Sequence, residues 1–152
     1  MYRVEDIANW FLQNIPNITN KKLQKLVYYA YSWHLVFNNE AADKIDLKLF
    51  DNKFEAWVHG AVYPELYVAY KKYGSGTIPK YEGELEAFSE DELDVLEQVS
   101  SVYGIYSGNE LENINHQESP WLLARGDLGA YEPSNAPITD STIFACYAER
   151  SA

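Results

Sequence analysis

The sequence predicts a mainly α protein, a compact single-domain helical fold of about six or seven helices with one small β-hairpin near residues 47–58. Apolar residues recur at helical spacing along most of the chain, so each of these segments has one side suited to a core. Helix-start signals, namely capping boxes and prolines at first helical positions, precede several of them. Residues that favour β-strands and are flanked by turn residues occur in one stretch only. Because no linker or internal repeat interrupts this pattern, we expect one domain over residues 1–152.

Two amphipathic helices are expected in the first forty residues. Apolar residues follow the i, i+3, i+4, i+7 spacing from about Val4 to Asn14, and Pro16 ends this helix. Thr19 suits the N-cap of a second, longer helix. Cations are unfavourable near a helix N-terminus, so three lysines there point to a surface role. The lysines are Lys21, Lys22 and Lys25, and the apolar stripe of the helix is Leu23, Leu26, Val27, Ala30, Trp33, His34 and Phe37.

The predicted hairpin leads into an aromatic helix. Residues 47–50, the turn 51–53 and residues 54–58 read as two short strands, and Pro64 suits the first position of the helix that follows. The sequence Gly74-Ser75-Gly76 ends that helix. Four tyrosines at three- or four-residue spacing lie on one of its sides, and a core and a recognition surface explain them equally well. They are Tyr63, Tyr67, Tyr70 and Tyr73.

Four further helices are expected in the second half of the chain. Two begin with a Ser and a Glu three residues later, and a third begins with Ser-Pro. Residues 126–137 are rich in Gly, Pro, Asn and Ser and are expected to form a loop. The start signals are Ser89 with Glu92, Ser107 with Glu110, Ser119-Pro120, and Thr139 or Asp140 before the last helix; Gly104 ends the first of the four.

Composition excludes several classes of function. The net charge is −11, and it is divided into +2 for residues 1–80 and −13 for residues 81–152. An acidic surface repels phosphate backbones, so no direct nucleic-acid binding is expected. The acidic half would attract a basic protein, although a solvated face that keeps the protein soluble is the simpler explanation. There is no leader, no apolar run long enough for a bilayer and only one cysteine, which predicts a cytoplasmic protein without a membrane partner.

No complete catalytic or metal-binding pattern is present. His34, His59 and His116 lack metal-ligand spacing, and Cys146 lies on an apolar helix where a thiol is inert, so we expect no metal, no cofactor and no enzyme. One enzymatic alternative stays open. It is a small hydrolase-type enzyme in which the fold brings His59, His116 and Glu65 together in a polar pocket.

Three separated strings carry a resemblance to a known family. They are K-L-Q-K-L-V-Y-Y-A at residues 22–30 with Trp33-His34, F-E-A-W-V-H-G-A-V-Y-P-E-L-Y at residues 54–67, and E-S-P-W at residues 118–121. Together they resemble the Panacea domain of the SocA-like, phage-associated antitoxins, also known as the GepA-like phage-associated proteins, over roughly residues 2–148. The resemblance implies an antitoxin that neutralises a cognate toxin, encoded by an adjacent gene, through direct protein–protein contact. A homodimer and the alternative of a proteolytic adaptor protein stay open.

The sequence departs from the family pattern at two positions. Gly60-Ala61 stands where the family usually has Gly-Pro, and Asn115 precedes His116 where a Thr is common, so we expect a looser turn at Ala61. Tyr and Trp side chains would be the anchors of a partner contact, and Arg125 would pair with a carboxylate of the partner or of its own fold. The expected partner-binding residues are Lys25, Trp57, His59, Gly60, Tyr63, Pro64, Glu65, Tyr67, His116, Pro120, Trp121 and Arg125.

Overall fold

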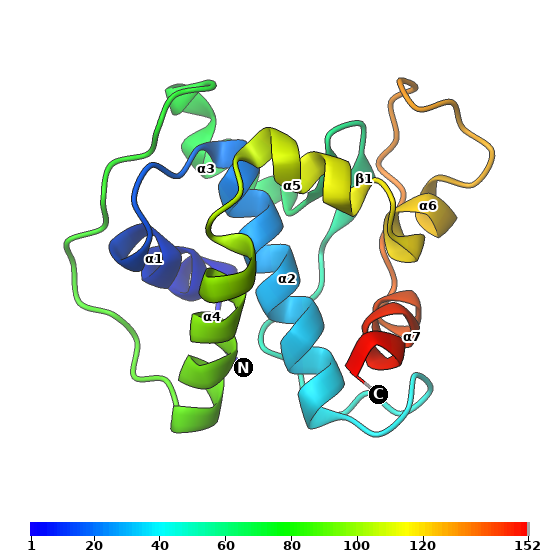
Figure 1. Ribbon diagram of the computed structural model, residues 1–152, viewed down its shortest axis with the longest axis horizontal. Coiled ribbons are helices and arrows are strands. Elements are labelled where there is room, and N and C mark those ends of the chain that lie inside the picture. Colours follow the sequence, from blue (N-terminus) through cyan, green and yellow to red (C-terminus); the bar gives the residue numbers. More distant parts are fainter. Residues whose placement is uncertain (152) are drawn as a thin grey trace.

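The computed structural model of the chain describes residues 1–151. These residues form a mainly α fold with one small antiparallel sheet, which confirms the predicted fold class (Figure 1). None of the helices in this range is long and apolar enough to cross a membrane. The elements are α1 (Val4–Asn14), α2 (Asn20–Asn38), β1 (Glu55–Trp57), β2 (Gly60–Val62), α3 (Pro64–Tyr70), the short 3-10 turn η1 (Lys71–Tyr73), α4 (Glu90–Tyr103), α5 (Gly108–Asn115), α6 (Ser119–Arg125) and α7 (Asp140–Ser151).

Helix α2 is the centre of the fold (Figure 1). It packs against α1, α3, α4, α5, α7 and strand β2, so its side chains are buried around almost the whole circumference. The predicted apolar stripe is part of this buried surface, except that Phe37 at its C-terminal end is 51% exposed. The expected surface role of the lysines is wrong for Lys22 and Lys25, because both side chains are buried.

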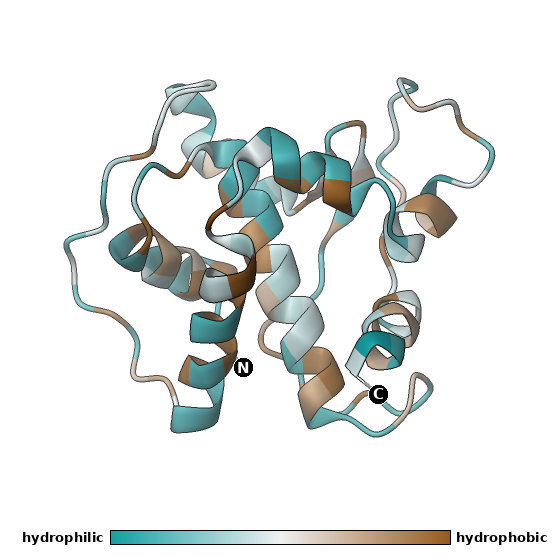
Figure 2. Cartoon of the chain, viewed as in Figure 1, coloured by the Kyte–Doolittle hydropathy of each residue, from teal (hydrophilic) through white to brown (hydrophobic). Residues whose placement is uncertain are grey.

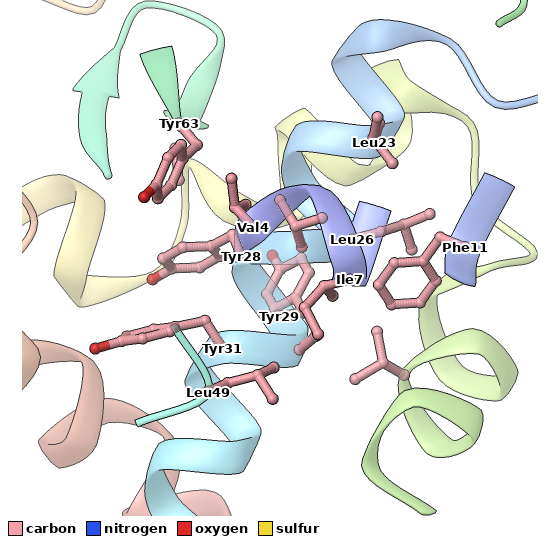
Figure 3. Close-up of a cluster of buried hydrophobic side chains, with 14 of the residues drawn as sticks. Val4, Ile7, Phe11, Leu23, Leu26, Tyr28, Tyr29, Tyr31, Leu49 and Tyr63 are labelled. Carbon is pink, nitrogen blue, oxygen red and sulfur yellow. The ribbon is translucent and has the colours of Figure 1, made fainter. Parts of the chain in front are cut away.

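The core lies between α1 and α2 and extends to α4 and α7. Figure 3 shows Ile7 and Phe11 of α1 beside Leu26 of α2, together with the tyrosine rings of α2. The ring of Tyr29 stacks on that of Tyr103 at 4.0 Å between centroids. Burying each such side chain contributes about 1.5–3 kcal/mol, so the aromatic residues of α2 account for much of the packing energy.

Helix α4 is amphipathic, and its two sides separate clearly. Val95, Leu96 and Val99 are buried toward α2, and the acidic residues of the helix face outward, as the teal and brown sides of α4 in Figure 2 show. The predicted capping box is confirmed, because the Ser89 N–H donates to Glu92 Oε1 at 2.8 Å and the Glu92 N–H donates to Ser89 Oγ at 3.2 Å. The acidic first turn also offsets the helix dipole.

The β-hairpin lies further along the chain than predicted. Strand β1 pairs with β2, with Glu55 opposite Val62 and Trp57 opposite Gly60, so Val58-His59 is the turn. The prediction of a strand at residues 47–50 is wrong, because Leu49 and Phe50 are buried in the core without pairing. The predicted turn at 51–53 therefore connects no paired strands. Within this segment the Asn52 side chain accepts the Phe54 N–H at 3.0 Å.

The tyrosine helix α3 begins at Pro64 as predicted and is followed by η1 and then Gly74, whose φ of 56° ends the helical path. Only Tyr63 belongs to the core, where its ring contacts Phe50 and Phe54 edge to face. Tyr67 and Tyr70 are half-buried. The tyrosine face is therefore core at its N-terminal end and partly accessible further along.

Candidate partner-binding site

Three side chains from the α5–α6 region hold the first strand and turn of the hairpin. Trp121 Nε1 donates to the Trp57 carbonyl at 2.7 Å, and His116 Nε2 donates to the Val58 carbonyl at 2.7 Å. Arg125 Nη1 donates to the Ala56 carbonyl at 3.2 Å. Three consecutive backbone carbonyls are thereby bonded by predicted site residues, which fixes the position of the Trp57 and His59 side chains.

The same three side chains stack on one another. The His116 ring lies 4.1 Å from the Trp121 ring and nearly parallel to it, and the Arg125 guanidinium lies 4.8 Å from the Trp121 ring. Burial lowers the pKa of His116, which keeps the imidazole neutral near pH 7. Arg125 also donates to the Gly129 and Glu132 carbonyls, at 2.8 and 2.6 Å. Among residues 1–151 its partners are backbone carbonyls rather than a carboxylate, so the expected ion pair within its own fold is wrong.

The turn end of β2 is fixed by a glycine and two polar side chains. Gly60 has a φ of 102°, and a Cβ built there would lie 2.6 Å from Lys25 Cε and 2.8 Å from Asn115 Oδ1. The Ala61 N–H donates to Asn115 Oδ1 at 2.7 Å, and Lys25 Nζ donates to the Ala61 carbonyl at 3.2 Å. The two positions that depart from the family pattern are therefore bonded to each other. A proline at position 61 would have no N–H to donate, so it could not form this bond to Asn115.

Glu118 is a buried acceptor that the sequence analysis did not single out. Its Oε1 accepts from the Tyr29 hydroxyl at 2.7 Å, the Tyr147 hydroxyl at 3.0 Å and Asn115 Nδ2 at 3.3 Å, and its Oε2 accepts from Arg150 Nη1 at 2.7 Å. Burial, with the charge of Glu118, raises the pKa of both tyrosines, which stay neutral donors. Because Asn115 also holds Ala61, this network joins the core to the hairpin.

The one sequence signal for Glu118 was its place directly before Ser-Pro-Trp. The pair Ser119-Pro120 predicts a helix with Ser119 as its N-cap, but Ser119 is the first residue of α6 and Glu118 occupies the cap position. The Glu118 side chain makes no capping bond and turns into the core instead. Its partners lie far away in the sequence, so no local pattern indicates it.

A ladder of amide side chains attaches α2 to α3. Gln24 Oε1 accepts the Tyr63 N–H at 2.9 Å, and Gln24 Nε2 donates to Asn20 Oδ1 at 3.0 Å. Asn20 Nδ2 in turn donates to the Tyr67 carbonyl at 3.1 Å. The polar residues at the start of α2 thus place the aromatic helix beside the hairpin.

A groove of about 450 Å³ opens between these elements at the N-terminal end of α2. Four of the predicted partner-binding residues line it, namely Lys25, Trp57, His59 and Tyr67. The rings of Trp57 and Tyr67 meet edge to face at 5.1 Å, and the His59 side chain is 65% exposed. Glu65 lies at the surface in an ion pair with Lys53. Tyr63, Pro120, Trp121 and Arg125 are buried behind this surface.

The three side chains of the hydrolase alternative have separate partners. His59 Nδ1 pairs with Glu112 at 2.9 Å, His116 bonds the Val58 carbonyl, and Glu65 pairs with Lys53 at 3.0 Å. Across the described residues these three side chains make no hydrogen bond to one another. Nor does the described range contain a group of three or more His, Cys, Asp or Glu side chains placed to hold a metal ion. The geometry gives the hydrolase alternative no support.

Lys25 makes the stability of the protein depend on pH. Burial lowers its pKa from the ordinary 10.5 to about 7, against the opposing effect of Glu112. Between these values the unfolded chain holds one more proton than the folded chain, so the free energy of unfolding rises with pH, by up to about 1.4 kcal/mol per pH unit. The tyrosines, whose pKa values are raised above 10, do not oppose this rise below about pH 9.

We expect urea unfolding between about pH 7 and pH 9 to show this increase, and a Lys25→Met variant to lose most of it. His34 and His116 do not contribute in this window, because burial lowers the pKa of each below the ordinary 6.5. A wild-type stability that is flat over the window would contradict the assignment.

A protein-family model matches the part of the chain that contains most of this site. No curated protein and no solved structure matches the chain. The family model described as "Antitoxin SocA-like, Panacea domain" matches residues 23–122, from the first turn of α2 to α6. This range contains the hairpin, the groove residues Gln24, Lys25 and Tyr67, and His116 and Trp121, which hold the hairpin, whereas Arg125 lies just beyond it. The chain belongs to the SocA-like antitoxin family with the Panacea domain.

Proposed function

We propose that the protein is an antitoxin that neutralises a toxin by direct protein–protein binding in the cytoplasm, the toxin being encoded by an adjacent gene carried with it on a prophage. The observation that carries the proposal is that the range matched by the family model contains a hairpin with accessible aromatic side chains, held in place by His116 and Trp121. The strings that resemble the family do not assemble a catalytic group. A rigid projecting surface loses little conformational freedom on binding, which suits a protein that acts by contact.

The twelve predicted site residues divide into two roles in this proposal. Those with accessible surface contact the toxin, and the others hold the hairpin in its binding position. The first group is Trp57, His59, Pro64, Glu65 and Tyr67. The second is the buried residues Gly60, Tyr63, Pro120, Trp121 and Arg125 and the half-buried His116, whose ring bonds the Val58 carbonyl; Lys25 is buried but lines the groove. Trp57 and Tyr67 are the expected anchors, because large aromatic side chains dominate the energy of protein interfaces.

Co-expression tests the function itself. The adjacent gene is induced in a host cell with and without this protein, and growth is recorded. We expect the neighbour to stop growth when it is alone and growth to recover when both are present. If the neighbour is harmless alone, or if the two proteins do not co-purify, the antitoxin proposal is wrong.

Replacement of the aromatic anchors tests the proposed surface. We expect Trp57→Ala and Tyr67→Ala each to weaken toxin binding by about 2 kcal/mol, roughly thirtyfold in Kd, as measured by calorimetry with an inactive toxin variant. The Trp57 carbonyl that holds Trp121 is unchanged by the substitution. The matched control is Tyr131→Ala, since this tyrosine is 90% exposed and lies outside the groove. Equal affinities for all three variants would place the contact elsewhere on the protein.

A further inference from the structure

The groove at the N-terminal end of α2 contains a buried lysine without a counter-ion. Lys25 lines the groove and is 1% exposed, and its Nζ donates one hydrogen bond, to the Ala61 carbonyl at 3.2 Å. An ammonium group has three donors. Within residues 1–151 no carboxylate forms an ion pair with it. Lys25 therefore has donors left for a ligand in the groove. A buried charge is costly unless it is paired, so a ligand that pairs with this lysine would be favourable.

The carboxylate of α5 that faces Lys25 is already occupied. Glu112 Oε1 accepts from Lys21 Nζ at 2.8 Å and pairs with His59 Nδ1 at 2.9 Å. The other titratable groups that interact electrostatically with Lys25 are Lys21 and His116. The first turn of α2 contains no acidic residue. Of the described residues, Lys21, Lys25 and His59 line the groove and no Asp or Glu does, so its lining is basic although the whole chain carries a net charge of −11. This favours an anionic group as the ligand.

The walls of the groove favour an aromatic or large apolar group next to that anion. Trp57 and Tyr67 form one wall, and their rings meet at 5.1 Å. The groove is completed by Gly74, Ser75, Gly108 and Asn109, and a Cβ built on Gly74 would meet nothing within 4 Å. The volume of about 450 Å³ is that of a small ligand pocket, and the open space at Gly74 leaves room for a main chain to enter and leave.

We propose that this groove binds an extended segment of a partner protein, with an Asp or Glu side chain of the segment against Lys25 and a neighbouring aromatic or large apolar side chain against Trp57 and Tyr67. The identity of the partner as a toxin rests on the proposed function, but the recognition chemistry does not. A carboxylate would accept the unused ammonium donors in a charge-assisted hydrogen bond, which is the stronger kind. The same contact would offset the cost of burying Lys25.

Two blocked dipeptides test the chemistry without the toxin. The probe Ac-Glu-Tyr-NH2 carries the carboxylate and the ring, and Ac-Gln-Tyr-NH2 differs only in the charge. Each is titrated to about 20 mM against the isotope-labelled protein, and the indole resonance of Trp57 and the amide resonances of Gly74 and Gly108 are followed by NMR. We expect saturable shifts with the Glu probe and binding at least about tenfold weaker with the Gln probe.

A Lys25→Met variant separates a binding role from a structural one. Met fills the same space without the charge, and losing the 3.2 Å bond to the Ala61 carbonyl costs less than burying an unpaired charge, so we expect the variant to melt at a higher temperature and to lose the preference for the Glu probe. The control is Lys44→Met, an exposed lysine that does not line the groove, which should keep both the melting temperature and the preference. A Lys25→Met variant that melts lower would assign Lys25 a structural role and overturn the proposal.

The inference is overturned if the two dipeptide probes bind with equal affinity, or if no resonance shifts at any probe concentration used. Neutralisation of the neighbouring gene product is scored separately. If the Glu probe binds as expected but no neutralisation is seen, the antitoxin function fails and the acidic-segment site stands. If neutralisation is seen but Lys25→Met leaves it and the probe binding unchanged, the site fails and the antitoxin function stands.

Discussion

A Glu118→Leu variant is expected to lose about 3–5 kcal/mol of unfolding free energy, a large part of the stability of a domain of this size. The Tyr29 hydroxyl and Asn115 Nδ2 lose the acceptor that they share, and Tyr147 loses one of its two. Each buried donor left without a partner costs about 1–3 kcal/mol. Urea unfolding, followed by the fluorescence of the tryptophans, measures the change.

Two control variants sharpen this result. Glu118→Gln keeps an acceptor oxygen for the two tyrosines and weakens the contact with the half-exposed Arg150, so we expect it to cost about 1–2 kcal/mol. Glu65→Gln removes an exposed ion pair with Lys53 and should cost less than about 1 kcal/mol. If Glu118→Leu is as stable as Glu65→Gln, the buried network does not stabilise the fold.

The second large effect is expected at the turn end of β2. Gly60→Ala places a Cβ 2.6 Å from Lys25 Cε and 2.8 Å from Asn115 Oδ1, and Asn115 is held in place by the Ala61 N–H and by Glu118. The φ of 102° adds backbone strain of about 1–2 kcal/mol for any residue with a side chain. We expect a total loss of about 3 kcal/mol, together with displacement of the hairpin and weaker toxin binding.

Gly74→Ala is the matched control for the steric part of this effect. Gly74 also has a positive φ, 56°, but a Cβ built there meets nothing within 4 Å. Its substitution should therefore cost the backbone strain alone, about 1–2 kcal/mol. Denaturant unfolding of both variants gives the difference directly. Equal losses at the two positions would mean that Lys25 and Asn115 move aside without cost.

The helices were predictable from sequence because their signals are local. The capping boxes at Ser89 and Ser107 and the proline at position 64 lie within one turn of the helix starts that they define. The hairpin begins eight residues later than predicted, at Glu55, so the segment expected as its second strand contains its first. Leu49 and Phe50 have strand-like character, but burial between helices competes with pairing for such residues, and only the packed chain decides between the two.

The candidate site was predicted only in part. The strings that resemble the family contained Trp57, His59 and Tyr67, which line the groove, and Arg125, a predicted site residue outside those strings, holds the hairpin. The role of Glu118 was not visible, because its bonds reach Tyr29 and Tyr147, which are 89 and 29 residues away. A surface role was expected for Lys25 because a cation is unfavourable near a helix N-terminus, and the helices packed around α2 bury it instead.

The sequence by itself determined that this chain is mainly helical, where most of its helices begin, and that it resembles the antitoxin family to which it belongs. Periodicity, capping and short strings act over a few residues, so they can be read without a structure. The tertiary structure alone decided the register of the hairpin, the burial of Lys25 and Glu118, and the groove between Trp57 and α2. These features depend on contacts between distant segments, whose free energies are settled only when the whole core packs.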